Sequence, residues 1–207
     1  MLITHGGKAP LVHPEAWVAP DATLCGDVEI GPGCRVLHGA RLIGEGGGTI
    51  RLGRECIVME NAVVRAGPQH PCRIGDNCLV GPNAHVVGAT LERQVFVATG
   101  AAVFHGAVLG KGSEVRIGAV VHLRTRLAPG ATVPIGWVAV GDPAEILPPD
   151  AHEAIWAKQQ PLDFPGFVYG LDRGTPDIMV AITRGLSRRL AAHREDAGGP
   201  RPAGETA

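Results

Sequence analysis

An aliphatic residue recurs every six positions along more than half of this chain, and this period limits the possible folds more than any other feature. The series begins at Val18 and ends at Ala139, with two loop interruptions and one five-residue unit. A period of six does not match the 3.6 residues of an α-helical turn, so amphipathic helices are excluded for this region. The aliphatic positions are Val18, Leu24, Ile30, Val36, Leu42, Leu52, Val58, Val64, Ile74, Val80, Val86, Leu91, Val97, Val103, Leu109, Val115, Val121, Leu127, Val133 and Ala139.

The other positions of each unit indicate how the chain turns. The fifth position is mostly Ala or Cys, and Gly or Asn usually fills the third or fourth position. Gly and Asn tolerate the left-handed backbone that tight corners need. Each unit therefore reads as one short strand and one corner, and three units complete a triangular coil. We predict an all-β fold, a left-handed parallel β-helix of hexapeptide repeats with a C-terminal α-helical segment, whose coils stack about 4.8 Å apart.

Stacking places every third unit on the same side of the coil. Side A begins with Val18 and Val36, side B with Leu24 and Leu42, and side C with Ile30. Cys34, Cys56 and Cys78 then lie one above another at inward corners. A soft-metal ladder is one interpretation, and small apolar corner fillers are the one we favour.

We divide the chain into three parts. Pro148 and Pro149 end the strand pattern, and Asp150 is a candidate N-cap. The final residues are rich in Gly and Pro, which is typical of disorder. The predicted parts are a β-helix over 11–147, a helical segment over 148–195, with helices at about 150–160 and 177–193 joined by an irregular strap over 161–172, and a disordered tail over 196–207.

Charge and hydropathy exclude several partners. The formal net charge is -1 and the pI is about 6.7, without the basic stripe that nucleic-acid binding needs. No stretch approaches the roughly 20 apolar residues that span a bilayer, and no secretory signal is visible at Met1–Lys8. The five cysteines form no C-x-x-C pair, which suits reduced thiols. We therefore expect a cytoplasmic protein that binds neither nucleic acid nor membranes.

The repeat, the ending Val140-Gly-Asp-Pro-Ala144 and the C-terminal helix resemble the gamma-class carbonic anhydrases and their hexapeptide-transferase relatives. The resemblance covers roughly residues 11–160. It implies a homotrimer with active sites between subunits. There, zinc is held by two His of side B of one subunit and one His of side A of the next.

The three ligand positions that this resemblance implies hold Arg65, Pro82 and Val87. Arg stays protonated, and Pro and Val carry no side-chain lone pair, so none of them can bind zinc. The family's Gln-Asp pair becomes Met59-Glu60, and its Arg-Gly-Asp motif becomes Gly44-Glu45-Gly46. We predict no metal at this place. A zinc or other divalent-metal cofactor is expected only if other residues build a relocated site.

Two hypotheses account for the replacements. His38, Glu60 and Pro82 stack on side A, and Arg65 lies above Val87 on side B. In the first hypothesis, Arg65 pairs with Glu60 of an adjacent subunit and fills the space of the metal. In the second, Arg65 and His38 bind a small anionic substrate, because guanidinium suits carboxylates.

The remaining histidines keep other functions open. His105 and His122 lie on side B one coil apart, so either is a candidate general base for an acyl-CoA-dependent acyltransferase, or they form part of a relocated metal site. His70, in the loop before Cys72, is interpreted as a solvated loop residue. His5, His13, His85, His152 and His193 fit no metal site in this interpretation. Whether the protein is an enzyme stays open, because fold alone does not decide function.

Overall fold

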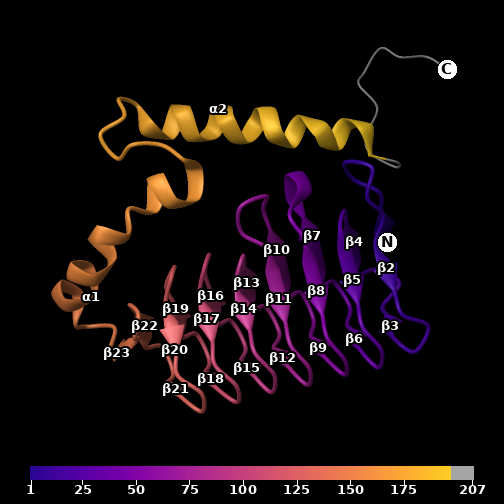
Figure 1. Cartoon of the computed structure of the whole chain (residues 1–207), viewed down its shortest axis with the longest axis horizontal. Coiled ribbons are helices and arrows are strands. Elements are labelled where there is room, and N and C mark those ends of the chain that lie inside the picture. The colour runs from indigo at the N-terminus through magenta and orange to yellow at the C-terminus, as the bar shows by residue number, and fades with distance from the viewer. Residues whose placement is uncertain (197–207) are drawn as a thin grey trace.

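The computed structural model describes residues 1–196, and it confirms the left-handed parallel β-helix. Three sheets of short, mostly parallel strands form a solenoid of about 8 turns, followed by two short C-terminal helices (Figure 1). The strands run from Leu2 to Leu147, so the first coil already begins ahead of the predicted start at Leu11. The boundaries of the three predicted parts otherwise stay predictions.

The three sheets correspond to the three predicted sides. Side A consists of β3 (Trp17–Val18), β6 (Arg35–Val36), β9 (Ile57–Val58), β12 (Leu79–Val80), β15 (Phe96–Val97), β18 (Glu114–Val115) and β21 (Thr132–Val133). Side B consists of β1 (Leu2–Ile3), β4 (Thr23–Cys25), β7 (Arg41–Gly44), β10 (Val63–Ala66), β13 (His85–Val87), β16 (Ala102–Val103), β19 (Val120–Val121), β22 (Val138–Val140) and β23 (Glu145–Leu147). Side C consists of β2 (Leu11–Val12), β5 (Val28–Ile30), β8 (Ile50–Leu52), β11 (Cys72–Ile74), β14 (Thr90–Leu91), β17 (Val108–Leu109) and β20 (Arg126–Leu127).

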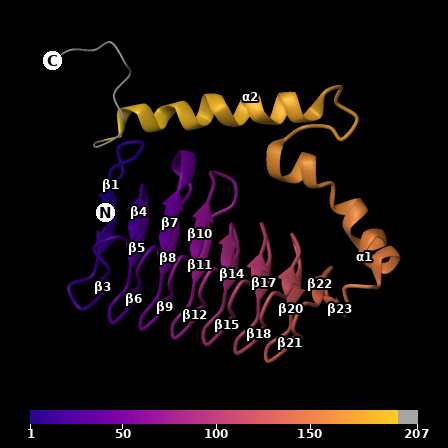
Figure 2. The ribbon, with the colours of Figure 1, turned by 180° about the vertical axis from the view of Figure 1, so that it is seen from behind.

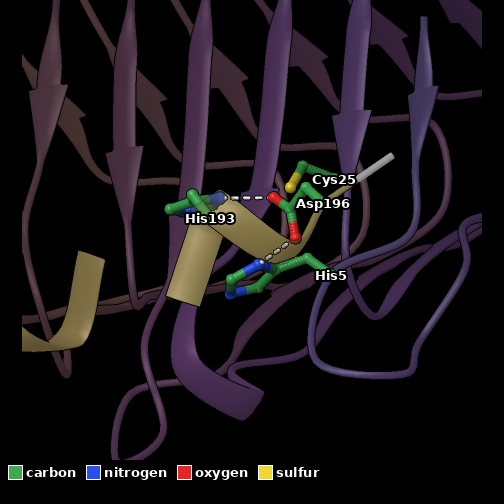
Figure 3. A group of neighbouring side chains, drawn as sticks. All are labelled: His5, Cys25, His193 and Asp196. Carbon is green, nitrogen blue, oxygen red and sulfur yellow. Dashed lines mark hydrogen bonds and ion pairs between the residues drawn. The ribbon is translucent and has the colours of Figure 1, made fainter. Parts of the chain in front are cut away.

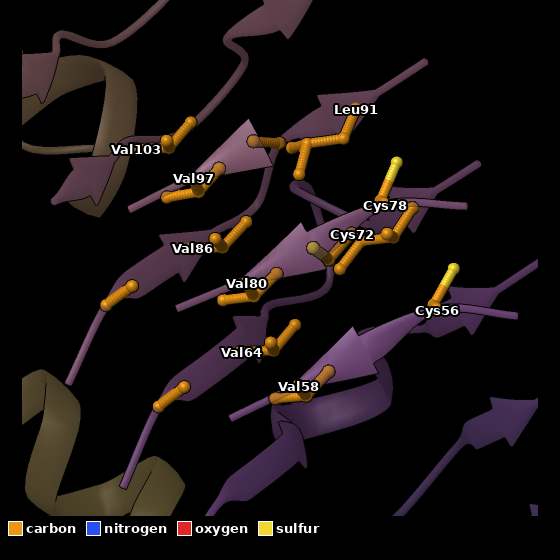
Figure 4. Close-up of a cluster of buried hydrophobic side chains, with 14 of the residues drawn as sticks. Cys56, Val58, Val64, Cys72, Cys78, Val80, Val86, Leu91, Val97 and Val103 are labelled. Carbon is orange, nitrogen blue, oxygen red and sulfur yellow. The ribbon is translucent and has the colours of Figure 1, made fainter. Parts of the chain in front are cut away.

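The core is a column of aliphatic side chains stacked in register. Val64 pairs with Val86 on side B, and Leu91 pairs with Leu109 on side C. Figure 4 shows Val64, Val86 and Leu91 among parallel rows of side chains that point into the coil. Each row continues through the solenoid because a six-residue unit returns the same side chain to the same place.

The corners confirm the turn chemistry expected from the sequence. Asn61, Asn77 and Asn83 all adopt positive φ angles, at 56°, 57° and 56°. Asn can hold this left-handed conformation at low cost, so each corner closes without a strained bulky residue.

The stacked cysteines fill corners and donate hydrogen bonds. The thiols of Cys34, Cys56 and Cys78 donate to the carbonyls of Gly53, Gly75 and Glu92 at 3.1, 3.0 and 2.9 Å. All five cysteines are free and buried. This geometry supports the corner-filler interpretation over a metal ladder.

The helical segment folds back along the solenoid. Helix α1 (His152–Gln159) lies at the end of the last coils, and its N-cap is Ala151 rather than the predicted Asp150. The expected irregular strap is a 3-10 turn (Gln160–Leu162) followed by a π-helical turn (Pro165–Tyr169). Helix α2 (Ile178–Leu190) then runs over side B toward the N-terminal coils, as Figures 1 and 2 show, and a 3-10 turn (Ala191–Glu195) follows it.

The predicted disordered tail is wrong at its first residue, because Asp196 is held by two histidine side chains. The rest of that prediction lies outside the described residues. Within residues 1–196, no helix combines the length and the apolar character needed to cross a membrane.

Candidate functional site

A cavity of about 470 Å³ lies between side B and the returning helical segment. Strands β10 and β13, the loop that follows β10, the π-helical turn and the end of α2 supply its walls. Of the predicted site residues, it brings together Arg65 and His105. Its lining consists of Glu45, Gly46, Arg65, Ala66, Gly67, Pro68, Gln69, His70, Val87, His105, Val168, Tyr169, Gly170, Leu186, Arg189 and Leu190.

Arg65 reaches this cavity because strand alternation sends Val64 inward and Arg65 outward. Its Nη2 atom lies 2.9 Å from Oε2 of Glu45, which belongs to a short 3-10 turn (Glu45–Gly47) between β7 and β8. The ion pair thus forms within one chain. The predicted pair between Arg65 and Glu60 of a neighbouring subunit stays a prediction.

His105 packs edge-on against His70 in the wall of the cavity. Their ring centroids are 5.1 Å apart, and His70 also contacts the Phe167 ring at 4.7 Å. His70 is therefore packed and half-buried, and its interpretation as a solvated loop residue is wrong. Burial, aided by the nearby His70, lowers the pKa of His105 to about 4. His105 is thus a neutral imidazole near pH 7, and its buried Nδ1 has no hydrogen-bond partner among the described residues.

The strap holds this corner of the cavity in place. Its Phe167 carbonyl lies 3.2 Å from His70 Nε2, and the Arg124 guanidinium lies 5.4 Å from the centre of the Phe167 ring. A side chain at Gly106 would meet the Phe167 ring at 3.1 Å. The close approach of the Gly106 backbone to the Phe167 ring therefore fixes the position of the π-helical turn.

Three other predicted residues do not line the cavity. His38 is exposed on side A and its Nδ1 lies 2.6 Å from Asp21 Oδ1. Glu60 and Pro82 are also on side A, where Asn83 donates its N–H to the Glu60 carbonyl. His122 lies one coil beyond His105, and burial lowers its pKa.

Sequence reasoning missed the parts of the cavity that come from distant segments. Tyr169 and Arg189 arrive with the strap and α2, and no hexapeptide rule places them. Glu45 had a signal, since it stands in the altered Gly44-Glu45-Gly46 motif. The sequence also showed no sign of a cluster that joins the two ends of the described chain. This cluster consists of His5, Cys25, His193 and Asp196, and both histidines also face Glu45.

Comparison with known proteins agrees with this architecture. Gamma carbonic anhydrase 1, a mitochondrial protein of Arabidopsis thaliana, is 37% identical over 146 residues, which are 68% of this chain and 50% of that protein. Gamma carbonic anhydrase 2 of the same plant is 29% identical over 91% of this chain and 69% of its own length. The chain is a gamma-carbonic-anhydrase-like hexapeptide-repeat protein. It spans about half the length of the first relative, and no family model matches it.

A solved structure shows the same fold. The UDP-N-acetylglucosamine acyltransferase LpxA from Bacteroides fragilis matches with a TM-score of 0.56 over 93% of this chain and 98% of its own, at 14% identity. At this identity, the likeness concerns the fold alone.

The zinc that the gamma-class likeness implies does not fit the corresponding positions. Arg65 pairs with Val87 in the side B register, so these two positions are neighbours as the likeness requires. Their side chains, together with that of Pro82, offer no atom that can ligate zinc. No zinc-hydroxide step is therefore derived at this place.

Proposed function

We propose that this gamma-carbonic-anhydrase-like protein is a homotrimer that lacks the family's three zinc-ligand histidines and binds a small anion beside Arg65. The observation that carries the proposal is the composition of the cavity. Arg65 and Arg189 line it with two positive charges, and Glu45, its only acidic lining residue, offsets one of them through its ion pair with Arg65. The imbalance favours a carboxylate, bicarbonate or phosphate group.

A protein without the interface zinc is expected to lack zinc-hydroxide hydration of CO₂ there. The metal is what lowers the pKa of bound water in that mechanism. Stopped-flow assays of CO₂ hydration by the purified protein should show no rate above buffer. If CO₂ hydration above the buffer rate persists after all metal has been chelated, the protein does more than bind an anion, and the proposal is contradicted.

The outward rows of the solenoid support the homotrimer. Side A presents Ile57, Leu79 and Phe96 outward in consecutive coils. In the same coils, side C presents Arg51, Arg73 and Thr90 outward, and the Arg51 Nε lies 3.1 Å from Glu29 Oε2. An apolar outward row suits burial against another copy, and a polar row suits solvent.

The oligomer is tested by light scattering coupled to size-exclusion chromatography. The wild-type protein should elute with three times the mass of one chain, and Phe96→Glu should dissociate it because a carboxylate would be buried. Thr132→Glu, on the same side at an exposed position, is the control. A monomeric wild-type protein would refute the trimer.

Anion binding is tested by isothermal titration with bicarbonate, acetate and inorganic phosphate. Arg65→Gln should weaken binding of the preferred anion by about tenfold or more, in line with a charge-assisted bond of about 1.5–3 kcal/mol. Arg65→Lys should recover part of it. Arg41→Gln is the control, since Arg41 lies one strand away and donates to the Gly39 carbonyl. Equal affinity in Arg65→Gln and Arg41→Gln would refute the proposal.

Acyl transfer is the second candidate, and the position of His105 in the cavity wall favours it. Near pH 7 His105 is unprotonated, as a general base must be, and its lowered pKa makes it a weak base. Titration with acetyl-CoA tests the idea, with His105→Gln expected to bind acetyl-CoA but to lose transfer. If the wild-type protein does not bind acetyl-CoA, acyl transfer is refuted, and so is the role of His105 as the general base of that reaction.

We also propose a cytoplasmic location, which rests on sequence composition alone. The plant relatives are named as mitochondrial proteins. Fractionation of the source cell, with an antibody to this chain, would decide between a cytoplasmic and a mitochondrial location.

A further inference from the structure

We propose that His5, Cys25, His193 and Asp196 form a structural binding site for one divalent transition metal of the zinc type, which fastens the C-terminal segment to the first coils. This site is separate from the three positions that the gamma-class likeness implies. It also does not depend on anion binding in the cavity.

The four residues come from three distant parts of the chain. His5 lies in the hairpin after β1, Cys25 ends β4, and His193 and Asp196 follow α2. Their ligand atoms all lie within 4.8 Å of one another. Figure 3 shows the four side chains converging on one point, with the Cys25 sulfur beside the Asp196 carboxylate. Two nitrogens, one sulfur and one oxygen make a donor set that zinc accepts in tetrahedral sites.

The site is buried where a structural metal would need it to be. His5 is 4% exposed, Cys25 is 3% exposed, and the Asp196 side chain is 9% exposed. In the described part of the chain, the thiols of Cys25 and Cys72 have no hydrogen-bond partner, unlike those of the other three cysteines. Cys72 belongs to the hydrophobic core, whereas the Cys25 sulfur lies within 4.8 Å of ligand atoms from two imidazoles and a carboxylate, which is the surrounding of a metal ligand.

Glu45 supplies the outer carboxylate that metal-bound histidines usually have. The Nδ1 atoms of His5 and His193 face Asp196, at 2.9 and 2.6 Å. Their Nε2 atoms both face Glu45, at 3.9 and 3.2 Å. Such carboxylates fix the ring orientation and strengthen the ligating nitrogen. Arg65 then completes the chain of contacts by pairing with Glu45.

Charge balance selects a divalent cation. With the metal bound, the Cys25 thiolate and the Asp196 carboxylate neutralise its two charges. The Glu45 carboxylate is neutralised by Arg65. Four protein ligands leave no open position, so the site is structural rather than catalytic. The soft thiolate and the imidazoles favour zinc over magnesium or calcium.

A purely hydrogen-bonded clasp is the competing explanation. In it, Asp196 accepts from both imidazoles, and the Cys25 thiol has no role. The two explanations therefore differ in what Cys25 does, and this difference decides the experiment.

The experiment uses the full untagged chain, stripped of metal with a chelator and titrated with Co²⁺ under reducing conditions. We expect one Co²⁺ per chain, with a sulfur-to-cobalt charge-transfer band and the strong visible bands of a tetrahedral site. Zn²⁺ should displace it stoichiometrically. Cys25→Ser should abolish the charge-transfer band and weaken Zn²⁺ binding at least tenfold. Cys72→Ser, a buried cysteine on side C, should change neither.

A second variant covers the case in which Cys25→Ser does not fold. His193→Ala removes a side chain that is one-third exposed and lies beyond the end of α2. It should also weaken Zn²⁺ binding at least tenfold, and Zn²⁺ should no longer slow alkylation of Cys25. The proposal is overturned if the wild-type protein gives no thiolate-to-cobalt band, or if folded Cys25→Ser binds Zn²⁺ as tightly as Cys72→Ser does. Where Cys25→Ser does not fold, unchanged Zn²⁺ affinity of His193→Ala overturns it.

Discussion

At the scale of single residues, the cavity depends on a few contacts that leave no room for change. Gly88 has a φ of +56°, and a side chain there would come within 2.6 Å of the His70 Cβ and 3.2 Å of the His105 ring. His105 is neutral because it is buried. The close backbone at Gly88 therefore fixes the positions of His70 and His105, and burial keeps His105 neutral.

Gly88→Ala is expected to lower the free energy of unfolding by about 1–3 kcal/mol for the left-handed backbone alone, and by more for the clash with His70. It should also weaken anion binding, because His70 must move. Urea denaturation and titration measure the two effects. Gly112→Ala carries the same backbone cost with no atom within 4 Å of the new side chain. Equal losses in the two variants would show that the clash is unimportant.

The buried His105 predicts how stability depends on pH. Its folded pKa of about 4 lies below the ordinary value of 6.5, so the unfolded chain takes up the proton first as pH falls. Above about pH 6.5, His105 is neutral in both the folded and the unfolded chain. As the pH falls from 6.5 to 4, the unfolded chain binds a proton that the folded chain does not, so the free energy of unfolding decreases. His105→Gln should flatten that part of the stability profile, as measured by urea denaturation at several pH values. His152→Gln, at an exposed site on α1, should leave the profile unchanged, and an unchanged profile in His105→Gln would refute the assignment.

At the scale of elements, the strap and α2 turn a plain solenoid side into a cavity. The hexapeptide pattern predicted every sheet, since each aliphatic position repeats a local rule. It could not predict the cavity, because Tyr169 and Arg189 reach Arg65 only through tertiary packing. Helix α2 was predicted close to its observed bounds, whereas the packing of His5 against His193, with ring centroids 4.1 Å apart, has no local signal.

Phe167→Ala is expected to release the strap from the solenoid. The lost contacts with His70 and Arg124 should cost less than the about 3–5 kcal/mol of a fully buried Phe, since Phe167 is only half-buried. The clearer result should be faster hydrogen exchange over Pro165–Tyr169. Phe164→Ala, on the same strap and 40% exposed, is the matched control. If exchange rises equally in both variants, Phe167 is not the anchor.

At the scale of the whole molecule, stability is distributed along a stack in which each coil contacts only its neighbours. Leu109 is fully buried in the middle of this stack. Leu109→Ala should therefore lower the free energy of unfolding by about 2–5 kcal/mol, as measured by urea denaturation. Thr132→Ala, at an exposed strand position, should change it by less than about 0.5 kcal/mol. A small effect of Leu109→Ala would mean that the coils collapse around the lost side chain.

The return of α2 along the solenoid has a consequence for how the protein is made. A ribosome delivers the first coils early, and those coils can stack as soon as they emerge, because their contacts are with the next coil. His5 must nevertheless wait for Asp196, which lies 191 residues further along the chain. The junction of His5 and Cys25 with His193 and Asp196 thus forms only on a chain that has been translated past Asp196. A product that stops short of Asp196 would carry stacked coils and an open junction.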